Sequence, residues 1–192
     1  MIYTQVASFI YKAGAVSVTN LDFELFRDYL EKQSGILLGD NKQYLVASRL
    51  RKIMELEKLQ SLAERVKRMQ TQPRSGLYQR VIDAMTTNET LWFRDTYPFE
   101  VMKKRVLPEL VQKYPNQRLR IWSAACSSGQ EPYSLSMMLD EYERSNLGQL
   151  RAGVQIVATD LSVSMLEACK SGEYDALSMG RGLSMERQQR YF

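Results

Sequence analysis

Residues 121–134 read Ile-Trp-Ser-Ala-Ala-Cys-Ser-Ser-Gly-Gln-Glu-Pro-Tyr-Ser, the stretch that fixes the fold of the second half of the chain. Arg118-Leu119-Arg120 alternates into it as a short strand, and small side chains fill positions 123–129. Pro132 stands where a first helical residue is favoured, and apolar residues then follow at helical spacing (Leu135, Met138, Leu139). Strand, small-residue loop and helix start predict an α/β sheet edge, where free N–H groups at a helix N-terminus meet a nucleotide-like ligand.

The small-residue loop departs from a dinucleotide fingerprint. G-x-G-x-x-G would place glycines at 124, 126 and 129, where the chain has Ala124, Cys126 and Gly129. A pyrophosphate needs glycine at the middle position so that the backbone can approach closely. Cys126 therefore disfavours a dinucleotide and favours an adenosine ligand without phosphate, such as S-adenosylmethionine. The structural alternative is a plain βα turn that binds nothing.

Composition bounds the class of protein. The chain has 192 residues, 44% hydrophobic and 25% charged, which is typical of a globular protein with one large or two small domains. It has no apolar run near 18 residues, so we expect no membrane insertion. Residues 1–20 form an N-terminal extension that lacks the basic start of a signal peptide. It is either a disordered tail or an extra helix.

Histidine is absent, and the two cysteines, Cys126 and Cys169, have no metal-ligand spacing. These facts exclude Ser-His and Cys-His nucleophiles, predict no metal site, and favour a reduced, cytoplasmic setting. If the chain is an enzyme, its chemistry should need little proton transfer.

Positive charge is concentrated in residues 41–80. Ten Lys and Arg stand there against three Glu, a balance of +7, which leaves −3 for the rest of a chain of net charge +4. A basic surface of this kind predicts an acidic partner. Nucleic acid is disfavoured because the block carries no recognisable nucleic-acid-binding motif.

Residues 21–86 are predicted to be all-helical. Helices are expected over 21–34, over 41–59, over 61–70 behind the capping box Ser61-x-x-Glu64, and from Ser75 or Gly76 to 85.

In the second of these helices an apolar face encloses an arginine. The face consists of Leu45, Val46, Leu50, Ile53 and Leu56, and Arg49 falls inside it. Arg49 is interpreted either as a guanidinium aimed at a carboxylate or as an arginine whose stem packs while its head reaches water. Arg51 and Lys52 lie on the polar side, as partner-binding residues or as part of a solvated face.

The remaining elements complete an α/β unit. Residues 87–100 are expected to be a linker that becomes packed, and 99–114 a helix bent or divided at Pro108. Residues 154–159 are β-branched and apolar, as in a buried parallel strand, and Ser162 caps a helix over 163–170. Asp160 ends that second strand, where it can accept the ribose hydroxyls of an adenosine. The alternative for Asp160 is a helix N-cap neighbour.

Three ordered motifs now converge: residues 86–94 (Thr-Thr-Asn-Glu-Thr-Leu-Trp-Phe-Arg), residues 122–134, and Ala158-Thr159-Asp160. Together they resemble the bacterial chemotaxis receptor methyltransferases, the CheR family, from about Leu21 to Phe192. The resemblance implies a small all-helical receptor-recognition domain (21–86) and a linker contributing to the cofactor site (87–100). It further implies the N-terminal part of a Rossmann-like, class I methyltransferase domain (101–192).

The same resemblance implies a cytoplasmic enzyme that methylates glutamate side chains of chemoreceptor cytoplasmic domains. S-adenosyl-L-methionine is then the cofactor and S-adenosyl-L-homocysteine the product. The implied cofactor-binding residues are Asn88, Thr90, Arg94, Ala125, Gly129, Glu131 and Asp160. Glu131 would face the methionine amino end, and Arg94 would also be the catalytic, orienting residue. Arg49, Arg51 and Lys52 would bind the receptor.

Family members continue past the position of Phe192 with further strands and closing loops. We therefore expect this chain to be a fragment, or to be completed by another chain, with open sheet edges that favour self-association. The rival interpretation is a non-catalytic module that binds S-adenosylmethionine or docks its basic helices on an acidic partner.

Overall fold

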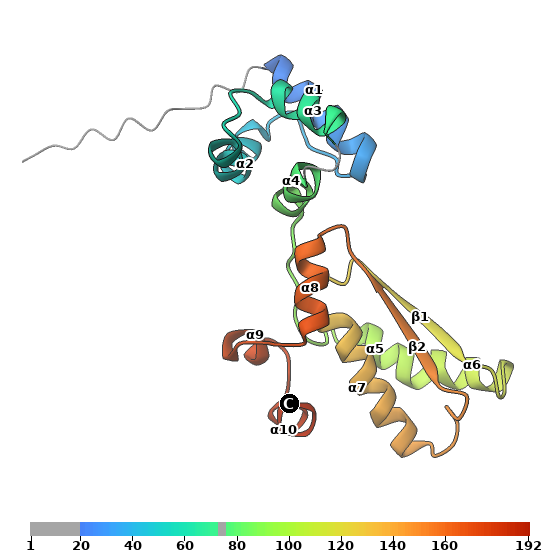
Figure 1. Ribbon diagram of the computed structural model, residues 1–192. Helices are drawn as coiled ribbons and strands as arrows, with labels where there is room; N and C mark the ends of the chain where they lie inside the picture. Colours follow the sequence, from blue (N-terminus) through green and yellow to red (C-terminus); the bar gives the residue numbers. More distant parts are fainter. Residues whose placement is uncertain (1–19, 73–75) are drawn as a thin grey trace, which may run out of the picture. The chain divides into compact units, whose positions relative to one another are not determined.

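The computed structural model describes residues 20–72 and 76–192, which form two compact units (Figure 1). The first unit ends at Met85 and the second spans Thr86–Phe192. Residues 1–19 of the predicted extension, and Ser75 as a helix start, lie outside the described residues. No helix in the described part of the chain is both long and apolar enough to cross a membrane.

The first unit is helical, with α1 (Asn20–Ser34), α2 (Gln43–Glu57), α3 (Leu62–Thr71) and α4 (Leu77–Met85) around one core. Local chemistry sets the start of α3 as predicted, because the Ser61 hydroxyl accepts the Glu64 N–H at 3.1 Å. The Glu64 carboxylate reaches back one residue further than a capping box requires, and accepts the Gln60 N–H at 2.8 Å.

The buried face of α2 is shifted from the predicted one. Val46, Leu50 and Met54, spaced four residues apart, are buried, whereas Leu56 is 72% exposed. The inclusion of Leu56 in the face was therefore wrong. Residues spaced four apart shift progressively around a helix. The neighbouring helices therefore cover Met54 and leave Leu56 exposed.

Arg65 does not belong to the basic surface that the sequence predicted. This α3 residue is fully buried, its Nη2 lies 3.4 Å from the Leu50 carbonyl oxygen, and its Nε and Nη1 have no partner within residues 20–72 and 76–192. Burial lowers its pKa to about 10. One of the ten basic residues thus contributes a desolvated charge to the core instead of a surface charge.

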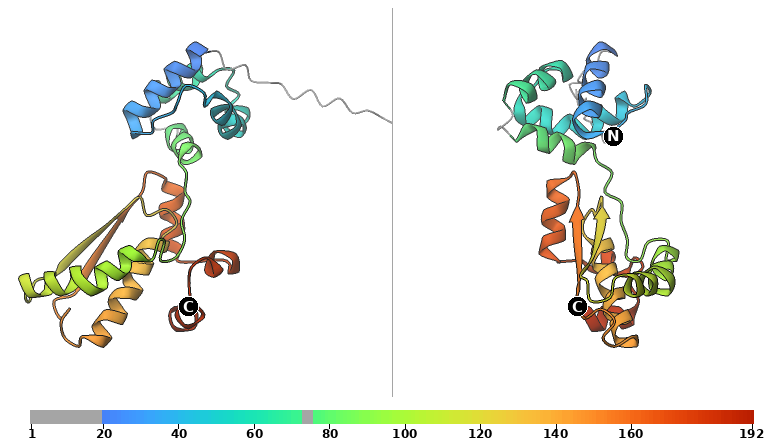
Figure 2. Two further views of the ribbon diagram at one scale, coloured as in Figure 1. Left: turned by 180° about the vertical axis from the view of Figure 1, so that it is seen from behind. Right: turned by 90° about the vertical axis from the view of Figure 1, so that its right-hand side faces the viewer.

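The second unit contains a parallel sheet of β1 (Leu119–Ala124) and β2 (Val154–Thr159), which lie side by side in both views of Figure 2. Leu119 pairs with Val154 and Ala124 with Thr159, so the two carboxyl ends meet at one edge. The crossover between the strands is α7 (Gln130–Ser145). The predicted class, a helical domain followed by an α/β domain, is confirmed.

The sheet is covered unevenly. Leu119, Ile121, Val154 and Ile156 join the core formed with α7, while Trp122, on the other face of β1, is 70% exposed. The strand 154–159 is half-buried along most of its length, and not fully buried as its composition had suggested.

The second unit also contains several further helical segments. One run consists of α5 (Tyr97–Val101), a π-helical turn η2 (Met102–Val106) and α6 (Leu107–Lys113). Pro108 lacks an N–H, and the wide η2 turn directly before it divides the run as predicted. The chain continues through α8 (Val163–Ser171), α9 (Ala176–Gly180) and α10 (Met185–Tyr191).

Candidate functional site

The loop after β1 turns sharply because it uses left-handed backbone conformations. Ala125, Ser127 and Gly129 have φ of 60°, 50° and 100°. The Cys126 N–H donates to the Thr159 carbonyl at 2.9 Å, which extends the sheet contact by one residue. The loop therefore closes against the end of β2 before α7 begins at Gln130.

Cys126 points into the protein. It is 1% exposed, its sulfur approaches the Ser127 carbonyl at 3.6 Å, and burial raises its pKa to about 11. The side chain is thus a neutral buried thiol. The residue that disfavoured a dinucleotide in the sequence does not itself stand in the way of a ligand.

Gly129 is required by packing as well as by its φ of 100°. A Cβ at this position would lie 2.8 Å from Cys169 Sγ and 2.8 Å from the Tyr174 hydroxyl. The Tyr174 hydroxyl donates to the Ser128 carbonyl at 2.7 Å, and burial raises the pKa of Tyr174, so the donor stays protonated. Because Gly129 has no side chain, Cys169 of α8 and Tyr174 can pack directly against the loop.

Asp160 is placed at the end of β2, as predicted, and it also holds the loop. Its Oδ2 accepts the Ser127 N–H at 2.8 Å and its Oδ1 accepts the Ser162 N–H at 2.8 Å. Ser127 in turn donates its hydroxyl to the Asn88 carbonyl at 3.0 Å. The structure therefore brings Asp160 and Asn88 together through Ser127, which the sequence reasoning had not selected.

Arg94 and Glu131 share one open cavity of about 280 Å³. Glu131, in the first turn of α7, accepts the Ser123 hydroxyl at 2.7 Å through Oε1. Arg94 is exposed, and its Nη1 donates to the Glu89 carbonyl at 3.3 Å. The cavity also includes Trp122 and Phe99, neither of which had been predicted as a site residue.

Five of the seven predicted cofactor-binding residues do not line that cavity. Thr90 is half-buried and Ala125 is exposed, and neither lines it. Asn88, Gly129 and Asp160 also lie outside its lining, and Cys126, Ser127 and Gly129 of the loop are buried. Within residues 20–72 and 76–192 no three His, Cys, Asp or Glu side chains gather as a metal site would require.

The predicted receptor-binding residues belong to the first unit. Arg49 is half-buried, and its Nη1 donates to the Met85 carbonyl at 2.8 Å, at the C-terminal end of α4. Arg51 and Lys52 are exposed on α2. Arg49 therefore has a structural contact in addition to its predicted role, because a cation at a helix C-terminus is favoured.

Two further basic residues form ion pairs within the first unit. The Glu57 carboxylate pairs with Arg68 at 3.0 Å and also with Arg80. Arg68 donates to the Glu57 carbonyl at 3.1 Å as well. The +7 balance already counts the charge of Glu57, so these pairs leave it unchanged, and Arg51 and Lys52 are among the exposed residues that carry it.

Comparisons with known proteins identify the family of both units. A model of the CheR methyltransferase SAM binding domain matches residues 88–192, and a model of the CheR methyltransferase all-alpha domain matches residues 21–86. S-adenosylmethionine, the predicted cofactor, is thus the ligand of the matched domain.

Curated relatives carry names of the same kind. The chain is 68% identical over 177 residues to the chemotaxis protein methyltransferase Cher2 of Pseudomonas putida, covering 92% of this chain and 64% of the relative. It is 72% identical over 177 residues to the chemotaxis protein methyltransferase 1 of Pseudomonas aeruginosa, with coverage of 92% and 64%. It is 49% identical over 179 residues to a chemotaxis protein methyltransferase of Vibrio anguillarum, with coverage of 93% and 64%. The chain thus spans 64% of the length of each of these relatives.

Proposed function

The chain belongs to the CheR methyltransferase family, and from this membership we propose that it methylates glutamate side chains. The methyl donor is S-adenosylmethionine, and the substrates are the cytoplasmic helices of chemoreceptors. The names of the relatives support a role in chemotaxis. The receptor glutamate as the accepting group and the cytoplasm as the location are parts of the proposal.

The shared cavity of Arg94 and Glu131 carries the proposal. Glu131 Oε2 accepts no hydrogen bond within the described residues, so it is available to an ammonium group such as the methionine end of the cofactor. Asp160 would hold the ribose, because each carboxylate oxygen retains a lone pair beside the N–H bond that it already accepts.

The bound cofactor supplies an electrophilic sulfonium methyl group. The chain then needs to align a nucleophile more than to move a proton, because a glutamate carboxylate with a pKa of about 4.3 is ionised at neutral pH. Arg94 would bind that carboxylate and orient it through charge-assisted hydrogen bonds. A histidine-free chain can support this reaction.

The exposed cations of α2 would meet the receptor. Arg51 and Lys52 can steer an acidic helix by long-range attraction, since both are solvent-exposed. Arg49, whose Nη1 binds the Met85 carbonyl at 2.8 Å, would add a third positive charge on the same helix.

Calorimetric titration with S-adenosylhomocysteine tests the cofactor site, and transfer of labelled methyl groups to a receptor cytoplasmic fragment tests the activity. We expect Arg94→Ala to lower the methylation rate roughly 100-fold. Arg94→Lys should restore little, because a lysine cannot bind a carboxylate bidentately. Arg118→Ala is the matched control, since this exposed arginine precedes β1 at the opposite end of the strand. If mass spectrometry places the methyl groups on residues other than glutamate, the proposed substrate is wrong.

A receptor-docking module without catalysis is the second candidate, favoured by the exposed position of Arg51 and Lys52. It predicts receptor binding that survives Arg94→Ala, with no methyl transfer by the parent protein. Self-association through the sheet edges also stays a prediction, and native mass spectrometry of the parent protein tests it.

A further inference from the structure

The turn that presents Arg94 has an unusual backbone. Phe93, Asp95 and Thr96 have φ of 48°, 62° and 48°, all in the left-handed region. For residues other than glycine, each such conformation costs on the order of 1–3 kcal/mol and persists only where its surroundings enforce it. Residues 93–96 are therefore held in place by contacts outside the turn.

Phe93 is the anchor of this turn. Its ring is buried, its N–H donates to the Ser134 hydroxyl at 3.0 Å, and its carbonyl accepts the Thr96 N–H at 2.8 Å. The ring centroid lies 5.0 Å from that of Phe99, which lines the cavity of Arg94 and Glu131. A displacement of the Phe93 ring would move both Arg94 and the cavity wall.

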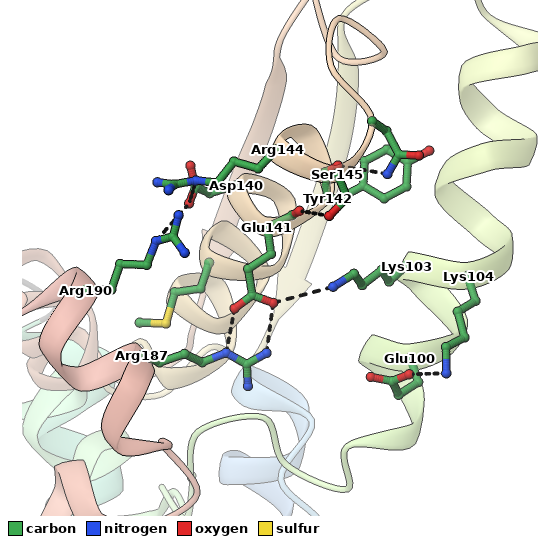
Figure 3. A network of polar contacts seen from close by, with 12 residues as sticks. Glu100, Lys103, Lys104, Asp140, Glu141, Tyr142, Arg144, Ser145, Arg187 and Arg190 are labelled. Carbon is green, nitrogen blue, oxygen red and sulfur yellow. Dashed lines mark hydrogen bonds and ion pairs between the residues drawn. The ribbon is translucent and has the colours of Figure 1, made fainter.

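Arg187 of α10 covers the other side of that ring. The centre of its guanidinium lies 3.7 Å from the Phe93 ring centroid. The same guanidinium donates two hydrogen bonds to Glu141 of α7, from Nε at 2.7 Å and from Nη2 at 3.0 Å, as Figure 3 shows. Lys103 of η2 approaches the same carboxylate at 3.7 Å.

The two contacts of Arg187 depend on each other. A bidentate bond to a carboxylate fixes the plane of a guanidinium, and a fixed plane can stack on an aromatic ring. The hydrogen bonds from Arg187 lower the pKa of Glu141, so the carboxylate stays charged around neutral pH. A lysine at position 187 could pair with Glu141 but could not also present a flat face to Phe93.

We propose that Arg187 is a positioning residue for methyl transfer. Its hydrogen bonds to Glu141 fix the guanidinium against the Phe93 ring. This contact stabilises the strained 93–96 turn, which places Arg94 at the cavity. The inference rests on the proposed function for its catalytic consequence. Arg187 itself does not line the cavity and needs no contact with substrate or cofactor.

The same α10 helix provides a matched control. Arg190 lies 4.0 Å from Asp140 of α7, and Tyr191 donates to Asp140 at 2.7 Å. Figure 3 shows Arg190 near Asp140, whereas Arg187 meets Glu141. Arg190 therefore helps to attach α10 to α7 without the stacking contact on Phe93 that Arg187 makes.

The experiment compares Arg187→Ala, Arg187→Lys and Arg190→Ala in the intact protein. Hydrogen exchange of a peptide covering residues 91–97, measured by mass spectrometry, reports on the turn without requiring activity. We expect Arg187→Ala to speed exchange there about tenfold, Arg187→Lys to do nearly the same, and Arg190→Ala to leave it unchanged. Methylation of a receptor fragment should then lose roughly 10- to 100-fold in kcat in both Arg187 variants, with KM for the fragment changed less than about threefold.

The outcomes separate the two levels of the proposal. Unchanged exchange over 91–97 in Arg187→Ala, or equal effects of Arg187→Ala and Arg190→Ala, would overturn the positioning role. Full recovery by Arg187→Lys would also overturn it, because charge alone would then suffice. A parent protein that binds S-adenosylhomocysteine but transfers no methyl group would refute the proposed function, and the exchange data would still decide whether Arg187 holds the turn.

Discussion

The Asp160 carboxylate at the end of β2 accepts the Ser127 N–H at 2.8 Å, so the second strand holds the loop that follows the first. Its other oxygen accepts the Ser162 N–H at 2.8 Å, at the start of α8. One side chain thus fixes the loop and a helix start, and it is also the candidate ribose ligand. These roles can be separated by measuring stability and ligand affinity together.

Replacing Asp160 by Ala should lower both quantities. Loss of two charge-assisted hydrogen bonds is expected to reduce the free energy of unfolding by about 1–3 kcal/mol, measured by urea denaturation. Calorimetry should show at least a tenfold weaker affinity for S-adenosylhomocysteine. The control is Asp175→Ala, because Asp175 also accepts a backbone N–H, that of Ser178 at 2.7 Å, but at α9. Equal loss of affinity in both variants would contradict a specific role for Asp160.

Gly129→Ala should be strongly destabilising. The strain of a positive φ costs about 1–2 kcal/mol, and the contact with Cys169 Sγ at 2.8 Å adds overpacking on the order of 1–3 kcal/mol. Gly153→Ala is the control for strain alone, since Gly153 has φ +78° and its added Cβ would meet nothing within 4 Å. Thermal unfolding of both variants measures the difference, and similar losses would mean that packing behind the loop is unimportant.

Arg65→Met should stabilise the first unit. The substitution removes a buried charge whose Nε and Nη1 lack partners within the described residues, and keeps an apolar side chain in the core. Replacing buried ionic groups by apolar ones has raised the free energy of unfolding by about 1–4 kcal/mol in other proteins, and we expect a gain in this range from urea denaturation. Arg68→Met is the matched control and should destabilise, because Arg68 pairs with Glu57 at 3.0 Å. A loss of stability in Arg65→Met would indicate that the buried guanidinium has an essential partner.

The hydrogen-bonded pair of Glu141 and Arg187 should make the stability of the protein depend on pH. The hydrogen bonds from Arg187 lower its pKa below the ordinary value of 4.5. A pKa depressed by folding contributes stability that is complete above pH 4.5 and is lost as the pH falls through the folded-state value. The advantage of the parent protein over Glu141→Gln in free energy of unfolding should therefore shrink as the pH falls below about 4.5. Glu109→Gln, which removes an exposed pair with Arg105, should show no comparable change.

Local signals predicted most of the secondary structure because they act within a few residues. The cap of α3 at Ser61, the cap of α8 at Ser162 and the division of a helix at Pro108 each depend on one side chain and its nearest backbone groups. The place of Asp160 at the carboxyl edge of the sheet also followed from sequence, because two parallel strands joined by a helix bring their ends to the same edge.

Charge and burial were less predictable, because they depend on distant neighbours. Ten basic residues between 41 and 80 read alike in the sequence, yet Arg65 is buried and Arg68 and Arg80 are paired with Glu57. Leu56 continued the apolar face of α2 by spacing and is nevertheless 72% exposed. Periodicity identifies which residues can share a face, whereas the packed helices determine which part of that face is covered.

The sequence by itself thus determined the helical and α/β units, the loop after β1, and the family to which these motifs belong. Only the tertiary structure placed Arg94 and Glu131 at one cavity, joined Ser127 to Asp160, and stacked Arg187 on Phe93. The reason is physical: caps, turns and periodicity are interactions between near neighbours in the chain, while a site is assembled from side chains that meet only after the strands and helices have packed.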